Sequence, residues 1–170
     1  MCKQKLSSSL NILLVFAALS LFILSCTIKV ETSDEKNEKI SENEKLFIFT
    51  LQKHLDAVSS KDIASLKSTL SPSGKMNLIL PNSEITNSTE EFIKFHEDWF
   101  EDTTWTFETN ILDTEIGDKI GIAVTEIIYR EPNRDGKPYF NRMFVSYGLI
   151  KLNGNWYVIQ DHASSVEKSQ

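Results

Sequence analysis

Three side chains with catalytic potential stand close together near the end of the chain, in the segment GNWYVIQDHASS. Asp161 and His162 could transfer protons, and Ser164 could act as a nucleophile if a base activated it. Because successive side chains of a regular strand point to opposite faces, Asp161 and His162 should lie on opposite sides of a sheet. A local Asp-His-Ser triad is therefore not expected, and the sequence has no G-x-S-x-G motif for a nucleophilic serine.

The predicted strand register decides which of these side chains points inward. A tight turn at 153–154 places Asp161 opposite Ser146 and His162 opposite Val145 in the last two strands. Asp161 then shares a face with most of the apolar strand residues. We expect this face to be concave and to pack on the helices.

Two further charged residues fall on the same predicted face, Glu126 and Arg142. They stand opposite each other if the turn at 133–136 is centred near Arg134. Together with Asp161 they are the polar candidates for a ligand-binding pocket. The alternative is a structural ion network around Arg142, since charges on an apolar face are commonly paired.

The chain has three histidines, and their spacing does not indicate a metal site or another cofactor. His54 lies on the apolar side of a predicted helix, His96 stands among aromatic residues, and His162 ends the last strand. His96 and His162 join Asp161 as candidate acids or bases, and Trp99 is a candidate wall for an apolar ligand. The alternative is that these residues belong to the core or its rim.

The apolar spacing predicts the elements that must position these residues. Helical spacing indicates a first helix over 44–58 and a second one after a capping box at Ser59 and Asp62. A second capping box at Ser88 and Glu91 starts a third helix. The predicted strands cover 76–80, 105–113, 119–130, 139–152 and 155–162.

This order of elements, with Gly154, Trp156 and Val158 followed by the polar residues 161–164, resembles the NTF2-like superfamily and its SnoaL-like branch. The resemblance covers residues 44–166. It implies an α+β fold: a cone in which N-terminal helices pack in the concave face of a curved, mostly antiparallel sheet, with a pocket at the open end. Since this fold hosts isomerases, dehydratases and plain binding modules, it does not assign a reaction.

The N-terminus predicts export. Lys3 and Lys5 precede an apolar run over 10–24, which is typical of a signal peptide. The following ILSC sequence resembles the lipobox of bacterial lipoproteins, which implies a signal peptide over 1–25 and a lipidated Cys26. Thr27 lacks the acidic character of an inner-membrane retention signal, so we expect a cell-envelope protein on the outer membrane, facing the periplasm or cell surface. The alternatives are an ordinary signal peptide and an uncleaved anchor.

After this signal, residues 26–43 are rich in Glu, Lys, Ser and Asn and predict a flexible tether, and 44–168 predict one folded domain. Cys2 would leave with the signal peptide, so no disulfide is expected. The net charge of -6 and the lack of a basic cluster exclude nucleic acid as the expected partner.

The sequence therefore predicts a lipid-anchored domain that binds a small apolar ligand or a protein partner, with a homodimer through the outer sheet face as one expected assembly. The alternative is an isomerase, dehydratase or hydrolase that uses Asp161 or a histidine as general base. An accessory role in immunity or in the envelope is a third alternative. No sequence feature selects the reaction or the ligand.

Overall fold

The computed structural model describes residues 41–170. The predicted signal peptide, the lipidated Cys26 and nearly all of the predicted tether lie outside these residues. The described elements are α2 (Glu42–Ser59), α3 (Ile63–Ser68), β1 (Asn77–Ile79), β2 (Ile85–Thr86), α4 (Thr89–Phe100), β3 (Thr106–Ile116), β4 (Ile120–Arg134), β5 (Lys137–Leu152) and β6 (Asn155–Lys168).

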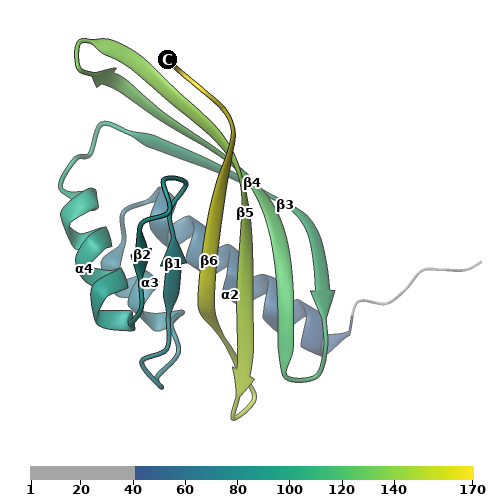
Figure 1. Ribbon diagram of the computed structural model, residues 1–170. Coiled ribbons are helices and arrows are strands. Elements are labelled where there is room, and N and C mark those ends of the chain that lie inside the picture. Colours follow the sequence, from purple (N-terminus) through teal and green to yellow (C-terminus); the bar gives the residue numbers. More distant parts are fainter. Residues whose placement is uncertain (1–40) are drawn as a thin grey trace, which may run out of the picture. The chain divides into compact units, whose positions relative to one another are not determined.

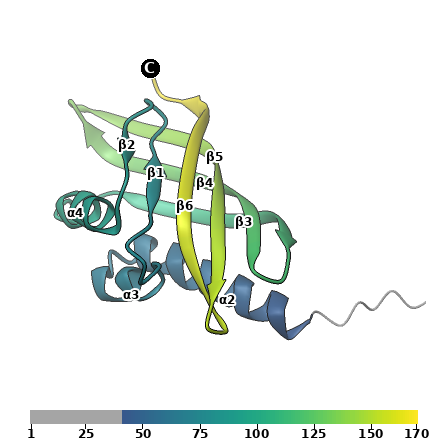
Figure 2. The same ribbon diagram turned by 60° about the horizontal axis from the view of Figure 1, so that its bottom comes forward.

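The six strands form one curved sheet in the order β2-β1-β6-β5-β4-β3 (Figure 1). Strands β3 to β6 are the predicted antiparallel meander, and β1 pairs in parallel with β6. Helix α2 lies across one face of the sheet, and α4 stands beside the β1–β2 hairpin (Figure 1, Figure 2). This arrangement confirms the predicted α+β fold. No helix within residues 41–170 is both long and apolar enough to cross a membrane.

Side-chain caps define where the helices begin. Ser41 and Glu44 form a reciprocal capping box, so α2 begins two residues earlier than the predicted residue 44. The capping box predicted at Ser59 and Asp62 is wrong. Asp62 caps α3 itself by accepting a hydrogen bond from the Ser65 N–H at 3.0 Å, whereas the Ser59 hydroxyl donates to the carbonyl of Phe107 at 2.8 Å.

Helix α2 packs tightly on the sheet through its apolar stripe. Phe47, Leu51 and Leu55 are fully buried. A Cβ atom at Gly121 of β4 would lie only 2.6 Å from Cε2 of Phe47. Glycine at this position therefore lets the helix approach the sheet backbone closely.

The face of the sheet that the helices cover, called the inner face below, is the opposite of the predicted one. In β4 and β5 the buried side chains are those at odd positions, including Ala123, Ile127, Val145 and Leu149. The prediction that Glu126 and the even positions of β5 face the helices is therefore wrong. The pattern of apolar residues predicted the wrong face because the outer face is also apolar. It carries the exposed side chains of Ile120, Ile122 and Phe144.

A β-bulge changes which side chains of β6 point inward. Leu152 pairs with Asn155 as predicted, but the pairing shifts by one residue at Ile159. Before the bulge the buried positions of β6 are Trp156 and Val158, and after it they are Asp161 and Ala163. The bulge thus reverses the facing of the rest of the strand.

This shift corrects the predicted partners of two candidate residues. Asp161 pairs with Tyr147 rather than with Ser146, and His162 pairs with Ser146 rather than with Val145. The predicted inner face was the wrong one, and the bulge then shifted the facing of Asp161 by one residue, so the two errors cancel at this position. Asp161 therefore does lie on the inner face, and His162 points outward.

Two other irregularities shape the meander. The β4–β5 turn is formed by Asp135 and Gly136, both with positive φ, rather than being centred near Arg134. Strand β3 has a bulge at Leu112, whose side chain is exposed. Such bulges bend and twist the strands that contain them.

Candidate functional site

A cavity of about 420 Å³ opens between the inner face of the sheet, α4 and the β1–β2 hairpin. This volume is in the range of pockets that bind small molecules. Aromatic side chains from four elements line it: Phe95 and Trp99 from α4, Phe107 from β3, Tyr129 from β4, and Tyr139 and Tyr147 from β5.

Helix α4 supplies one wall of the cavity. Ser88 caps the helix by accepting a hydrogen bond from the Glu91 N–H at 3.1 Å. Trp99 is then held in place by Trp105, whose ring stacks on it with a centroid distance of 4.3 Å and an interplanar angle of 12°. The Trp105 indole N–H also donates to the Trp99 carbonyl at 3.2 Å. Trp99 is therefore a rigid part of the cavity wall.

His96 lines the same cavity and is almost fully buried. Its Nδ1 atom lies 2.8 Å from the Phe92 carbonyl oxygen, which can only accept, so Nδ1 must carry the proton. Burial lowers the pKa of His96 to about 4, although the bond to Phe92 acts in the opposite direction. The ring is neutral at pH 7, and its Nε2 atom is a hydrogen-bond acceptor.

Asp161 is the buried carboxylate of the cavity, with an exposed fraction of 8%. Burial raises its pKa to about 7, and a hydrogen bond with the Tyr147 side chain opposes part of this shift. Within residues 41–170 no ion pair joins Asp161 to a basic side chain. The carboxyl group can therefore exchange a proton near neutral pH.

Two more polar side chains line the cavity without a partner in the described part of the chain. They are Asn141, through its Oδ1 atom, and Ser165, through its hydroxyl oxygen. Burying such a group without a hydrogen bond costs free energy, so both atoms are available to hydrogen-bond a molecule that enters the cavity. The two residues belong to neighbouring strands, β5 and β6.

The mouth of the cavity is formed by the β4–β5 turn and the end of β6. The Tyr129 hydroxyl donates to Glu131 at 2.5 Å, and Glu131 also pairs with Arg134. The Arg134 guanidinium lies 3.4 Å from the centre of the Tyr139 ring. Burial, followed by the bond to Glu131, raises the pKa of Tyr129 to about 12.

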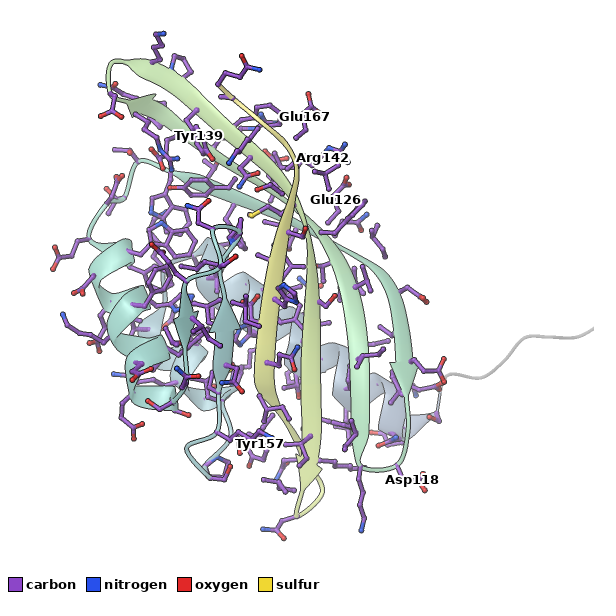
Figure 3. The ribbon with its side chains drawn as sticks, viewed as in Figure 1. Asp118, Glu126, Tyr139, Arg142, Tyr157 and Glu167 are labelled. Carbon is purple, nitrogen blue, oxygen red and sulfur yellow. The ribbon has the colours of Figure 1, made fainter. Side chains whose placement is uncertain are left out.

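Of the residues predicted to form the site, the structure brings Asp161, His96 and Trp99 together around one cavity. Glu126 and Arg142 do form an ion pair at 3.1 Å, but on the outer face, where Arg142 also lies 3.7 Å from Glu167. Figure 3 shows these three charged residues on the side of the sheet away from Tyr139. Neither Glu126 nor Arg142 lines the cavity, which corrects their predicted place in it.

Two histidines lie outside the cavity lining. His162 is exposed on the outer face, so it cannot reach the same space as Asp161. His54 is fully buried, and its Nδ1 atom lies 2.8 Å from the hydroxyl oxygen of Thr69. That hydroxyl donates to the Leu66 carbonyl, so His54 must be the donor in this contact. His54 is therefore a neutral core residue beneath Tyr147.

Asn141 and Tyr147 line the cavity but were predicted to lie on the outer face. The large apolar side chains at other odd positions of β5, Met143, Val145 and Leu149, could have indicated that the odd positions are buried. Ser165 had no signal in the sequence, since its inward position depends on the bulge at Ile159. Residues 41–170 contain no cluster of three or more potential metal ligands.

Comparison with known proteins agrees with this architecture. The profile of the SnoaL-like domain family matches residues 49–167. No curated protein matches the sequence. Among solved structures, a ketosteroid isomerase-like protein from Erwinia carotovora atroseptica is similar, with a TM-score of 0.64 and 16% identity. That match covers 75% of this chain and 98% of the other.

Two further structures extend the likeness. A proposed dehydratase of the NTF2-like family from Streptomyces avermitilis has a TM-score of 0.64 and 13% identity, over 74% of this chain and 97% of that one. A proposed association domain of a calcium/calmodulin-dependent protein kinase type II from Thiobacillus denitrificans has a TM-score of 0.60 and 9% identity, over 69% and 93%. At these identities the structures establish the fold alone.

The predicted resemblance to the NTF2-like superfamily is thus confirmed by the family profile and by the fold. The matched range begins within α2, ends one residue before the end of β6, and contains every element between them. It also contains all three predicted residues that line the cavity, Trp99, His96 and Asp161. The chain belongs to the SnoaL-like domain family.

Proposed function

We propose that this protein binds a small, largely apolar molecule in the cavity on the inner face of its sheet. The observation that carries the proposal is the pair of buried polar atoms without partners, Asn141 Oδ1 and the Ser165 hydroxyl, inside an aromatic wall. A fully packed core would have closed this space, and most buried polar atoms of such a core are paired. A bound molecule provides both the apolar contact and the missing hydrogen bonds.

Binding of the neutral fluorophore N-phenyl-1-naphthylamine tests this proposal. Ala163 and Ser164 are neighbours on β6, but only Ala163 lines the cavity, whereas Ser164 is exposed on the outer face. Ala163→Phe should fill the cavity and abolish the fluorescence increase. Ser164→Phe, which adds a ring outside, should bind like the wild type.

Ala163→Leu provides a milder test if the phenylalanine variant does not fold, and circular dichroism checks the fold of each variant. Equal binding by the wild type and a folded Ala163 variant would place the fluorophore elsewhere and refute the proposal. Absence of binding by the wild type would refute it as well.

A second candidate function is proton transfer on the bound molecule, supported by the burial of Asp161 beside Tyr147. A carboxyl group with a pKa of about 7 is suited to remove or return a proton near neutral pH. The ketosteroid isomerase-like and dehydratase likenesses are consistent with this chemistry. Exchange of the α-protons of 2-tetralone in D₂O, followed by NMR, should be faster with the wild type than with Asp161→Asn. Equal rates would exclude this role.

We also propose that Cys26 carries a lipid that anchors the protein to the outer membrane, facing the periplasm or cell surface. The support is the ILSC sequence behind a signal-peptide pattern. In a bacterial host, Cys26→Ser should abolish both labelling by radioactive palmitate and sedimentation with membranes. Cys2→Ser is the matched control and should change neither, because Cys2 would be removed with the signal peptide. Unchanged labelling of Cys26→Ser would refute the anchor.

The outer face is proposed to pair with a second copy of the chain. Ile120, Ile122 and Phe144 are exposed there by 63%, 55% and 43%, and they lie on the adjacent strands β4 and β5. The similar fold described as a kinase association domain supports an assembly role. Light scattering after size exclusion should show a dimer that Ile122→Lys converts to a monomer. Thr106→Lys, at an exposed position at the start of β3, is the control and should remain a dimer. A monomeric wild type would refute the dimer.

A further inference from the structure

The buried polar groups of the cavity are mostly hydrogen-bond acceptors. His96 has its proton on Nδ1, bound to the Phe92 carbonyl, so Nε2 is left as an acceptor. Asn141 has an unpartnered Oδ1 atom, and Asp161 contributes a carboxylate. The remaining buried polar atom without a partner is the Ser165 hydroxyl, which can donate or accept. A ligand that satisfies the three acceptors must donate hydrogen bonds.

Two of the three phenol groups that line the cavity do not supply those donors. The Tyr129 hydroxyl donates to Glu131 at 2.5 Å. Burial, followed by the charge of Asp161 and a hydrogen bond to its carboxylate, raises the pKa of Tyr147 well above its usual value, so this phenol keeps its proton.

The charge inside the cavity has no counter-ion among the described residues. The other charged lining residues are Glu84, Arg134 and Lys168, which are all exposed at the mouth. Arg134 is paired with Glu131, and Glu84 and Lys168 have opposite signs. The mouth is therefore close to balanced in charge, whereas the ionised interior carries the negative charge of Asp161 alone.

The aromatic wall is suited to a positive charge. Cations are attracted to the faces of Trp, Tyr and Phe rings, and the attraction grows when water is excluded. Trp99 and Tyr129 face the cavity with ring centroids 5.7 Å apart, and Phe107 lies 5.8 Å from Trp99. A buried carboxylate in a cavity that such rings also line is suited to bind an ammonium group on an apolar body.

We propose that the ligand of this cavity is an organic cation, a protonated amine on a flat apolar body, whose ammonium group pairs with Asp161. Its apolar body lies against the aromatic wall. A carboxylate in the same position would meet Asp161 with like charge. This inference rests on the proposed function and specifies the chemistry of the ligand.

Three indoles of nearly equal size test the charge of the ligand. Tryptamine is a cation, tryptophol a neutral donor and indole-3-acetate an anion at pH 8. Each competes with N-phenyl-1-naphthylamine for the cavity of the wild type. Tryptamine should bind roughly 10- to 100-fold more tightly than tryptophol, as expected for a charge-assisted hydrogen bond, and indole-3-acetate should bind most weakly.

Asp161→Asn removes the charge with little change in shape. It should retain the fluorophore and lose the preference for tryptamine. Asp118→Asn, which changes an exposed carboxylate in the β3–β4 turn, is the matched control and should keep the preference. The ranking of the three indoles by the wild type does not depend on the folding of any variant.

The outcomes separate this inference from the proposed function. If the fluorophore binds but tryptophol or indole-3-acetate equals tryptamine, the cation is refuted and the apolar site stands. If Asp161→Asn folds and keeps the preference for tryptamine, Asp161 is not the counter-ion and the inference fails. If the wild type does not bind the fluorophore, the proposed function and this inference both fail.

Discussion

Burial of Asp161 links the protonation of one carboxyl group to the stability of the whole domain. Its pKa is about 7 in the folded chain, against an ordinary value of 3.8. Between these two pH values the unfolded chain releases the proton and the folded chain retains it. The contribution of Asp161 is therefore most favourable below about pH 4 and is lost as the pH rises to about 7.

Asp161→Asn should abolish this loss. The free energy of unfolding of the variant, minus that of the wild type, should increase from pH 4 to pH 7 and then stay constant. Urea denaturation at fixed pH values measures this difference. Asp118→Asn should give a flat difference across the same range, since Asp118 is exposed. A flat difference for Asp161→Asn would show that its carboxyl group titrates normally.

The two buried histidines have the opposite pH dependence. Burial, with repulsion from His96 as a smaller cause, lowers the pKa of His54 to about 3, and burial lowers the pKa of His96 to about 4. The ordinary value is 6.5, so the unfolded chain takes up these protons first as the pH falls. Stability contributed by the neutral rings is present above about pH 6.5 and is lost below it.

Replacing both histidines by glutamine should make unfolding less dependent on pH between 6.5 and 4. The measurement is the urea midpoint at half-unit pH steps, with tryptophan fluorescence as the signal. His162→Gln is the control, because His162 is exposed and its replacement should leave the wild-type dependence unchanged. If the double variant kept the pH dependence of the wild type, the two buried histidines would not be its cause.

At the scale of elements, the packing of α2 on β4 depends on the missing side chain of Gly121. Gly121→Ala should destabilise the domain by about 1–3 kcal/mol, because its Cβ would overlap the Phe47 ring. Phe47→Leu in the same chain should recover part of this loss. Gly148→Ala is the milder comparison, since its nearest neighbour would be Gln160 Cβ at 3.3 Å. Chemical denaturation of the wild type, the two single variants and the double variant gives the four free energies of unfolding that are compared. If the effects of Gly121→Ala and Phe47→Leu simply add in the double variant, the two residues are not in contact.

The bulge at Ile159 determines which side chain β6 presents to the cavity. Deleting Ile159 should remove the extra residue and join Val158 to Gln160 in a regular ladder, with Asp161 still opposite Tyr147 on the inner face. NMR of the side-chain carboxyl carbons should then show the pKa of Asp161 still near 7. Deletion of Val166, a second bulge residue beyond Asp161, should also leave that pKa near 7. An Asp161 pKa at its ordinary value after deletion of Ile159 would show that Ile159 is not the extra residue of the bulge.

The sequence predicted these elements well where local signals are strong. The cap at Ser88 is a side-chain interaction within a few residues, and the Asn153–Gly154 turn needs only the φ preference of its two residues. Strand β2 has two residues and no periodicity of its own, so it was missed. The bulge at Ile159 was missed because nothing in β6 alone distinguishes it from its apolar neighbours.

The face assignment failed for a reason connected with function. Inner positions such as Thr125, Asn141 and Tyr147 are polar or mixed, whereas outer positions such as Ile122 and Phe144 are apolar. Alternation assumes that the inner face is the more apolar one. A sheet that has polar residues among those of its inner face and apolar side chains exposed on its outer face does not meet that assumption. Such departures are expected at functional sites.

For the molecule as a whole, the two faces of the sheet carry separate sets of side chains. The inner face encloses Asp161, His96 and Asn141, and the proposed ligand contacts belong to it. The outer face carries the apolar side chains proposed to contact a second copy, together with the Glu126–Arg142 ion pair. Because the sheet separates the two sets of side chains, a substitution on one face can be tested while the side chains of the other face stay unchanged.

Strand β3, with its bulge at Leu112, is the long outermost strand of the sheet. An unpaired strand of this length offers its backbone groups to any further strand and so invites aggregation. The exposed acids Glu108, Asp113 and Glu115 would repel an identical strand placed alongside, and the bulge interrupts the regular spacing that pairing requires. Growth of the sheet from copy to copy is thus opposed, so the proposed dimer would have to form through the faces of the sheets.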